Sequence, residues 1–140
     1  MTVPARLHIV TLAVADLPTS VGFYSALGWR KASSSFEEIA WFDVGGCWLG
    51  LFPREHLADD AGVSASAGFG VTLAMNLESP QAVDEAIATA EAVGAVVTQP
   101  AARVEWGGYR GYFADPDGHL WEIAHNPNFP IRPDGSLVIP

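Results

Sequence analysis

Glu122 is the side chain whose place in the sequence most directly suggests chemistry. It lies in an apolar run, between Trp121 and Ile123. Burial of an unpaired carboxylate costs free energy and raises its pKa, which suits the group to proton transfer or to holding a cationic part of a ligand. Two plainer roles explain the same pattern, namely pairing with an arginine such as Arg110 or Arg103, and a place at a solvated edge. The residues alone leave these roles open.

Aromatic and basic side chains precede Glu122 in the chain. A Gly-rich stretch typical of a hairpin entry holds Trp106, Tyr109, Arg110 and Tyr112. Indole and phenol groups offer flat apolar surface with one polar atom each, and a guanidinium can hold a carboxylate or phosphate. We therefore expect these residues to line a ligand pocket, with ordinary packing against the C-terminal tail as the alternative.

The first half of the chain offers a second group of candidates. Trp48 and Phe52 lie two residues to either side of Gly50, so all three share one face of a strand. Thr11 and Thr72 occupy equivalent positions in the two halves and can hydrogen-bond a ligand. A filled, dry interior would use the same aromatic residues, and threonine is also simply a good strand former.

The elements that position these residues occur twice. The tetrapeptide VTLA is found at residues 10–13 and again at 71–74. Each copy is followed by a helix-capping residue, Asp16 or Ser79, with a proline in the first turn, and then by a helical stretch that a glycine closes. Strand-like runs follow each helix, at residues 29–33, 39–44, 48–52, 95–98, 109–114 and 119–124. Turn residues separate two pairs of them, at Gly45-Gly46 and at 115–118.

This duplication predicts an α+β fold of two βαβββ modules. The modules form a curved mixed sheet around a concave cavity, with the helices on the outer face, and a short β-rich ferredoxin-like arrangement is the rival. We expect a single domain, with module one at about residues 7–53, a linker at about 54–69 and module two at about 70–125. A Pro-rich tail follows at 126–140, with a terminal strand at 137–139.

Three segments resemble the vicinal oxygen chelate superfamily, which includes glyoxalase I, extradiol dioxygenases, and the bleomycin and fosfomycin resistance proteins. They are VTLAVADL (residues 10–17), FYSALGW (23–29) and WGGYRGYFADPDGHLWEIAHNP (106–127), the last being the most specific. The resemblance implies the fold described above. It leaves the function among isomerases, dioxygenases, transferases and pure binding proteins, because all of these share the fold.

The metal enzymes of that superfamily hold a divalent ion with four residues, usually His and Glu, on the first and last strands of each half. Carried over to this sequence, the four positions fall on Ile9, near Gly50, at about Gly70 and on Glu122. Only Glu122 has a ligand side chain, and one carboxylate does not make a Mg, Mn, Ni, Zn or Fe site. We therefore expect no cofactor, and a divalent metal is disfavoured.

Composition excludes several classes of partner. The chain has 140 residues, of which 49% are apolar, so a core can be buried, and its 7 basic against 16 acidic side chains give a net charge of −9. This charge repels nucleic acid and anionic membranes. The single cysteine excludes an internal disulfide. No run approaches the roughly 20 apolar residues of a membrane span, and the N-terminus lacks a signal-peptide pattern, so we expect a cytoplasmic protein.

Together these observations predict a small-molecule-binding protein similar to the bleomycin resistance branch. It would take an apolar or aromatic organic ligand in the cavity without an obligatory metal. The alternative is an enzyme of the same superfamily, a lyase or isomerase of lactoylglutathione lyase type or a dioxygenase-like protein, with Glu122 as base or metal ligand. The resemblance also implies a homodimer, because a half-sheet leaves strand edges that a two-fold partner can cover.

Overall fold

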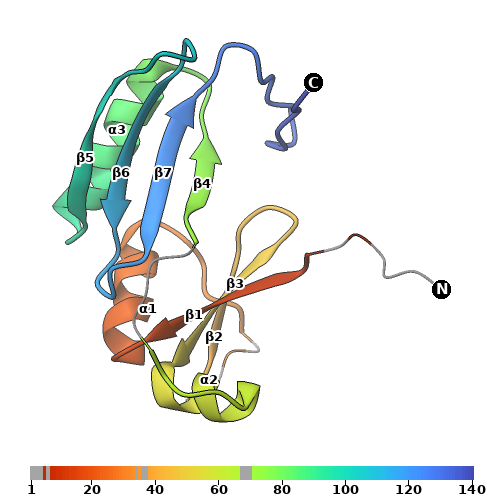
Figure 1. Cartoon of the computed structure of the whole chain (residues 1–140), viewed down its shortest axis with the longest axis vertical. Helices are drawn as coiled ribbons and strands as arrows, with labels where there is room; N and C mark the ends of the chain where they lie inside the picture. The colour runs from red at the N-terminus through yellow and green to blue at the C-terminus, as the bar shows by residue number, and fades with distance from the viewer. Residues whose placement is uncertain (1–4, 6, 34, 36–37, 67–70) are drawn as a thin grey trace. The chain divides into compact units, whose positions relative to one another are not determined.

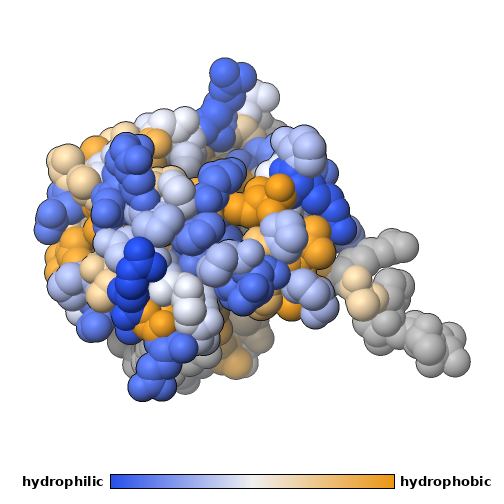
Figure 2. All heavy atoms as spheres, turned by 90° about the horizontal axis from the view of Figure 1, so that it is seen from above, coloured by the Kyte–Doolittle hydropathy of each residue, from blue (hydrophilic) through white to orange (hydrophobic). Residues whose placement is uncertain are grey.

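The computed structural model describes residues 5, 7–33, 35, 38–66 and 71–140. The chain forms two compact units, residues 1–67 (unit 1) and 68–140 (unit 2), and each is described by itself. None of the helices in the described residues is long and apolar enough to cross a membrane. The surface seen in Figure 2 is largely hydrophilic, with apolar residues in separate patches between polar side chains.

Unit 1 contains three strands and two helices. These are β1 (Ile9–Val14), α1 (Leu17–Ala26), β2 (Ala40–Asp43), β3 (Trp48–Pro53) and α2 (Arg54–Ala61). The strands lie in the order β1-β3-β2, and β1 runs parallel to the central strand whereas β2 runs antiparallel to it. A single bridge between Lys31 and Phe42 continues the sheet beyond β2. The short strand expected at residues 29–33 is thus reduced to one bridged residue.

One face of this sheet packs against α1. The helix begins where expected, since the Asp16 carboxylate accepts a hydrogen bond from the backbone N–H of Thr19 at 3.0 Å. Alternate strand residues, among them Phe42, Leu49 and Leu51, are fully or almost fully buried on the helix side. The Tyr24 ring of α1 lies 6.0 Å from the ring of Phe42. The other face of the sheet is not covered by α1.

Two local features of unit 1 bear on the expectations from sequence. The Gly45-Gly46 turn is confirmed, with φ values of +85° and +97° that only glycine adopts readily. The stretch expected as a linker contains the helix α2, which the composition concealed. Its sequence, REHLADDA, is polar, and Ala58 is its one buried residue.

Unit 2 repeats the pattern with a fourth named strand. Its elements are β4 (Leu73–Asn76), α3 (Pro80–Ala92), β5 (Val96–Arg103), β6 (Tyr109–Ala114) and β7 (Leu120–His125). The strand order is β4-β7-β6-β5, with β4 parallel to β7 and the other pairs antiparallel. In both units the strand before the helix pairs in parallel with the last strand. The expected α+β fold is confirmed. Unit 2 has the full βαβββ order, whereas unit 1 has the single bridge at Lys31 in place of one strand.

Helix α3 covers one face of the unit 2 sheet (Figure 1). Ser79 caps it by accepting a hydrogen bond from the backbone N–H of Ala82 at 3.0 Å. Its buried residues, Val83, Ile87 and Ala90, form a stripe with helical spacing. On the sheet, Phe113, Trp121 and Ile123 are buried. Side chains one position away on β6 and β7 therefore point to the face without the helix.

The turn between β6 and β7 sets the register of this unit. The Asp115 carboxylate accepts hydrogen bonds from the backbone N–H groups of Asp117 and His119, both at 2.9 Å. Gly118 closes the turn with a φ of +85°. The turn expected at residues 115–118 is confirmed, and the register that it starts pairs Tyr112 with Glu122.

Two expectations for unit 2 differ in length from the structure. The strand expected at residues 95–98 continues to Arg103 as β5, with irregular pairing between Val97 and Ala102. Pro100 lies in this irregular part, and a proline without an N–H is tolerated there because β5 is an edge strand. The terminal strand expected at 137–139 is a single bridge between Ile131 and Leu137.

Gly111 on β6 is expected to be intolerant of a side chain. A Cβ there would lie 2.5 Å from Cδ1 of Ile87 and 3.0 Å from the backbone nitrogen of Ala101. We expect Gly111→Ala to lower the free energy of unfolding by about 1–3 kcal/mol, the usual cost of overpacking. Thermal and denaturant unfolding measure this loss.

Gly22 provides the matched control, because it lies inside α1 and its Cβ would meet nothing within 4 Å. Gly22→Ala should raise stability by about 0.5–1 kcal/mol through better helix propensity. Equal effects of the two substitutions would contradict the close packing of α3 on β6.

Candidate functional site

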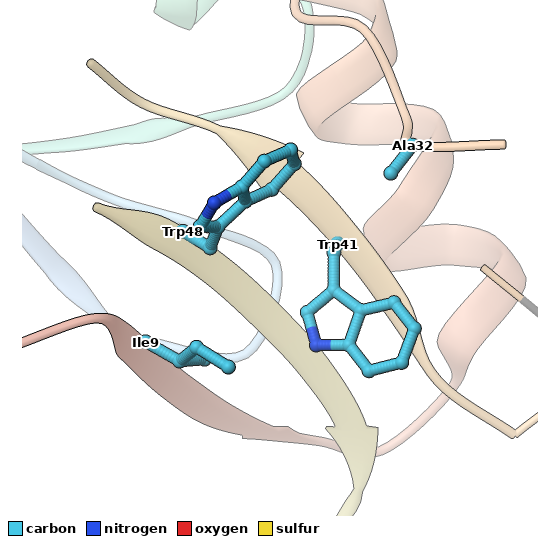
Figure 3. Close-up of a pocket in the computed structure, with 4 residues that line it drawn as sticks. All are labelled: Ile9, Ala32, Trp41 and Trp48. Atoms are coloured by element: carbon cyan, nitrogen blue, oxygen red, sulfur yellow. The ribbon is translucent and has the colours of Figure 1, made fainter. Parts of the chain in front are cut away.

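A pocket of about 280 Å³ lies on the face of the unit 1 sheet that α1 does not cover. Its walls are Ile9 of β1, Trp41 of β2, Trp48 of β3, and Ala32. Trp41 and Trp48 project to the same side of the sheet, flanked by Ile9 and Ala32 (Figure 3). Ile9 and Trp48 are paired neighbours on β1 and β3. All four residues are apolar or aromatic, so the pocket suits an apolar or aromatic ligand. We call it the tryptophan pocket.

Gly50 lies beside this pocket, at one of the positions where the resemblance would place a metal ligand. A Cβ at Gly50 would be 3.1 Å from Oγ1 of Thr11, 3.4 Å from Cδ1 of Trp41 and 3.5 Å from Cγ2 of Ile9. The space that a ligand side chain would need is therefore already lined by its neighbours. A larger residue would have to displace Thr11 or Trp41.

The structure brings together some of the unit 1 candidates and separates one. Trp48 forms a wall of the tryptophan pocket and is 39% exposed, and Thr11 pairs with Gly50 beside it. Phe52 is not among the residues that line the pocket, and its ring lies 6.0 Å from that of His56 in α2. Trp41 was missed from the sequence. A two-residue turn at Gly45-Gly46 places Trp41 opposite Gly50, so the position of Trp41 could have been predicted from the turn.

In unit 2, three polar side chains share the sheet face opposite α3. Glu122 is paired with Tyr112 on one side and with Ala74 on the other. Arg110 lies two residues before Tyr112 and so has the same orientation. The guanidinium carbon of Arg110 is 5.9 Å from the centre of the Tyr112 ring, within the range of a cation–π interaction. We call Arg110, Tyr112 and Glu122 the β6–β7 polar group.

The charges of Glu122 and Arg110 influence the pKa of Tyr112. Burial raises the pKa of Tyr112, and the negative charge of Glu122 and hydrogen bonding to its carboxylate raise it further, whereas the positive charge of Arg110 opposes these effects. The phenol therefore stays protonated at neutral pH and can donate to the carboxylate. Arg110 Nη1 is buried and has no hydrogen-bond partner among the described residues. That nitrogen therefore makes no hydrogen bond to Glu122.

Tyr109 lies on the other face of the sheet, apart from the polar group. Its hydroxyl donates to Oδ1 of Asp84 in α3 at 2.6 Å, and that hydrogen bond raises the pKa of Tyr109. Its cross-strand neighbour is His125, whose Nδ1 lies 2.9 Å from the carbonyl oxygen of Leu77. Strand alternation separates Tyr109 from Tyr112, because their offset of three residues is odd.

Trp106 and Thr72 lie outside the strands of the unit 2 sheet. Trp106 is 50% exposed in the turn between β5 and β6, where a Cβ at Gly108 would be 1.6 Å from its ring, so the indole covers that glycine. Thr72 is exposed just before β4, two residues from the Ala74 that pairs with Glu122. Gly70, the expected third metal position, falls outside the described residues.

The residues present do not fit the divalent ion that the resemblance implies. Within the described ranges, no three His, Cys, Asp or Glu side chains gather in a way that could hold a metal. Ile9 and Gly50 offer no donor atom in their side chains, and the crowding around Gly50 leaves little room for one. Glu122 is left as a lone carboxylate beside a phenol.

Known proteins are similar to this chain over most of its length. The family described as the Glyoxalase/Bleomycin resistance protein/Dioxygenase superfamily matches residues 6–123. The metallothiol transferase FosB of Shouchella clausii (strain KSM-K16) is 28% identical over 114 residues, which are 81% of this chain and 75% of that protein.

Solved structures match more completely. The glyoxalase-related enzyme from Fulvimarina pelagi is 34% identical, with a TM-score of 0.90, and the match covers 97% of this chain and 99% of that one. A glyoxalase/bleomycin resistance protein/dioxygenase from Nocardioides is 28% identical, with a TM-score of 0.73, and covers 89% of this chain and 85% of its own.

The coupling of Tyr112 to Glu122 gives a prediction about titration. Glu122→Gln removes a negative charge, so the pKa of Tyr112 should fall, but it should stay above the ordinary value because burial, the largest cause, remains. Asp84→Asn is the matched control, since it should lower the pKa of Tyr109 and leave Tyr112 unchanged. NMR titration of isotope-labelled tyrosine rings measures both. A Tyr112 pKa that is the same with and without the Glu122 carboxylate would show that the two groups are not neighbours.

Proposed function

Because the chain belongs to the Glyoxalase/Bleomycin resistance protein/Dioxygenase superfamily, we propose that it binds a small apolar or aromatic molecule in the tryptophan pocket, without an obligatory metal. The observation that carries the proposal is the pocket itself, about 280 Å³ with Ile9, Ala32, Trp41 and Trp48 as its walls. A dry apolar cavity of about 150 Å³ is enough for benzene, so this pocket has room for a somewhat larger ring compound. Two indoles supply surface for ring stacking.

The lack of metal donors supports binding without a metal. Two positions that hold metal ligands in the metal enzymes of the superfamily carry Ile9 and Gly50 here, and both border the tryptophan pocket. The Trp41 ring also lies 3.4 Å from the place of a Cβ at Gly50. In this proposal, affinity comes from burial of apolar surface and from contacts with the two indoles.

A neutral ring compound tests the pocket directly. We expect indole to bind and to shift the NMR signals of the Ile9 methyl groups, because these lie in the pocket wall. Trp48→Ala should weaken binding about tenfold, since an aromatic pair contributes about 0.5–1.5 kcal/mol beyond its buried area. Ala32→Leu, which fills the space and keeps both tryptophans, should also weaken it.

Trp106→Ala is the control for the pocket variants, because it removes an indole that lies in the β5–β6 turn of unit 2. Indole affinity should not change in this variant. If all three substitutions have the same effect, or if none has any, the ligand does not lie between Trp41 and Trp48.

Metal content provides a separate test. Protein purified without added metal should contain no stoichiometric Mn, Fe, Ni or Zn, because a lone Glu122 carboxylate binds such ions weakly. Elemental analysis measures this directly. About one ion per chain, lost in Glu122→Ala, would overturn metal independence.

An enzymatic function is the second candidate, and the β6–β7 polar group is the observation that favours it. A protonated phenol beside a carboxylate is a pair that can pass a proton, with Glu122 as general base of a lyase or isomerase. The relatives FosB, a metallothiol transferase, and the glyoxalase-related enzyme from Fulvimarina pelagi are enzymes by name. Turnover of a substrate that falls about 100-fold in Glu122→Gln, with affinity unchanged, would favour this function over pure binding.

We also propose that the chain forms a homodimer. Strand β1 lies at the edge of its sheet, and Ile9 on this strand is 47% exposed, with Leu7 just before it 68% exposed. Edges of this kind are commonly covered by a partner. Light scattering should give twice the chain mass of 14.9 kDa. A monomer at micromolar concentration would contradict the dimer.

A further inference from the structure

We propose that Arg110 anchors a binding site for a small oxyanion, a carboxylate or a phosphate group, on the face of the unit 2 sheet opposite α3. The residues from which this site is argued all lie in unit 2. The central observation is that Nη1 of Arg110 is buried without a hydrogen-bond partner among the described residues. A buried donor that belongs to a charged group and lacks a partner is costly.

The strands on either side of Arg110 offer it no acceptor. Its cross-strand neighbours are Ala124 on β7 and Ala102 on β5. Both side chains are methyl groups, so they supply no oxygen to the guanidinium. In a fold built for stability alone, an acidic residue at either position would complete an ion pair. With alanine at both positions, the neighbouring strands give the buried Nη1 no side-chain acceptor.

Glu122, a carboxylate on the same face of the sheet, interacts with Tyr112. Glu122 lies directly across from Tyr112, and the two groups interact through charge and hydrogen bonding. The Tyr112 ring also lies 5.9 Å from the guanidinium carbon of Arg110, which orients the planar group. The phenol therefore contacts both other side chains, Glu122 through its hydroxyl and Arg110 through its ring.

The chemistry of the guanidinium identifies the ligand class. It stays charged at all relevant pH values and presents paired N–H donors that match the two oxygens of a carboxylate or of a phosphate. A neutral acceptor, such as an amide, offers one oxygen and no charge. We therefore expect Nη1, which lacks a hydrogen-bond partner among the described residues, to bind an oxyanion more tightly than its neutral analogue.

Titration with three small probes tests this site. Acetate and inorganic phosphate represent the two oxyanions, and acetamide is the neutral analogue of acetate. We expect at least one oxyanion to shift the NMR signals of the Arg110 side chain in low-salt buffer, and acetamide to leave them unchanged. Acetate and phosphate are too small and polar to report on the tryptophan pocket, so the result is independent of indole binding.

Two arginine variants provide the comparison. Arg110→Met keeps the length of the side chain and should lower oxyanion affinity at least tenfold. Arg103→Met is the matched control, because Arg103 pairs with Tyr109 and so lies on the opposite face. It should leave affinity unchanged.

Thermal unfolding without any anion distinguishes recognition from a structural role. If Arg110 serves a ligand, Arg110→Met removes an unpaired buried charge and should leave the melting temperature equal or higher. A lower melting temperature together with no oxyanion binding to the wild-type chain would overturn the proposal, and would show that Arg110 only packs on Tyr112. Equal oxyanion affinity in Arg110→Met and the wild type would overturn it as well.

Discussion

The packing of one helix against one face of each sheet is the interaction on which the other features depend. In unit 1, α1 buries Phe42, Leu49 and Leu51, and in unit 2, α3 buries Phe113 and Ile123. This burial supplies the apolar area that stabilises each unit. Because side chains alternate along a strand, it also assigns every other residue to the opposite face. The residues on the face without a helix are therefore determined by which residues the helix buries on the other face.

The two free faces have different chemistry although the units share one topology. The face in unit 1 is aromatic and apolar around Trp41 and Trp48, and the face in unit 2 carries the coupled side chains of Arg110, Tyr112 and Glu122. The duplicated strand order thus positions two chemically different sets of side chains. Gly50 has no side chain, and Thr11 and Trp41 lie next to the position that its Cβ would occupy.

Much of the fold could be predicted from sequence because it depends on local signals. The capping residues Asp16 and Ser79, and the turn at 115–118, act through hydrogen bonds to their own neighbours. The helix α2 could not be predicted in this way, because its residues are polar and only Ala58 is buried. The extension of β5 was hidden by Pro100, which an edge strand tolerates.

The candidate sites depend more on pairing between strands, and so were only partly predictable. Glu122 and Tyr112 were identified by type, but their direct opposition required the register of β6 and β7. Tyr109 could have been separated from Tyr112 by counting along the strand. The alanines across from Arg110 on β5 and β7 could be identified only from the strand register, so its unpartnered nitrogen was not predictable.

The two-residue turn at Gly45-Gly46 has a consequence for how this protein can diverge. It holds Trp41 opposite Gly50 and Asp43 opposite Trp48. If an insertion of one residue shifted the pairing of β2 by one position, Trp41 would turn toward the helix and Phe42 would turn outward. Homologues with a longer turn could therefore keep every tryptophan and still present another surface. The length of this turn, more than the identity of the aromatic residues, should mark which sequences inherited the same pocket.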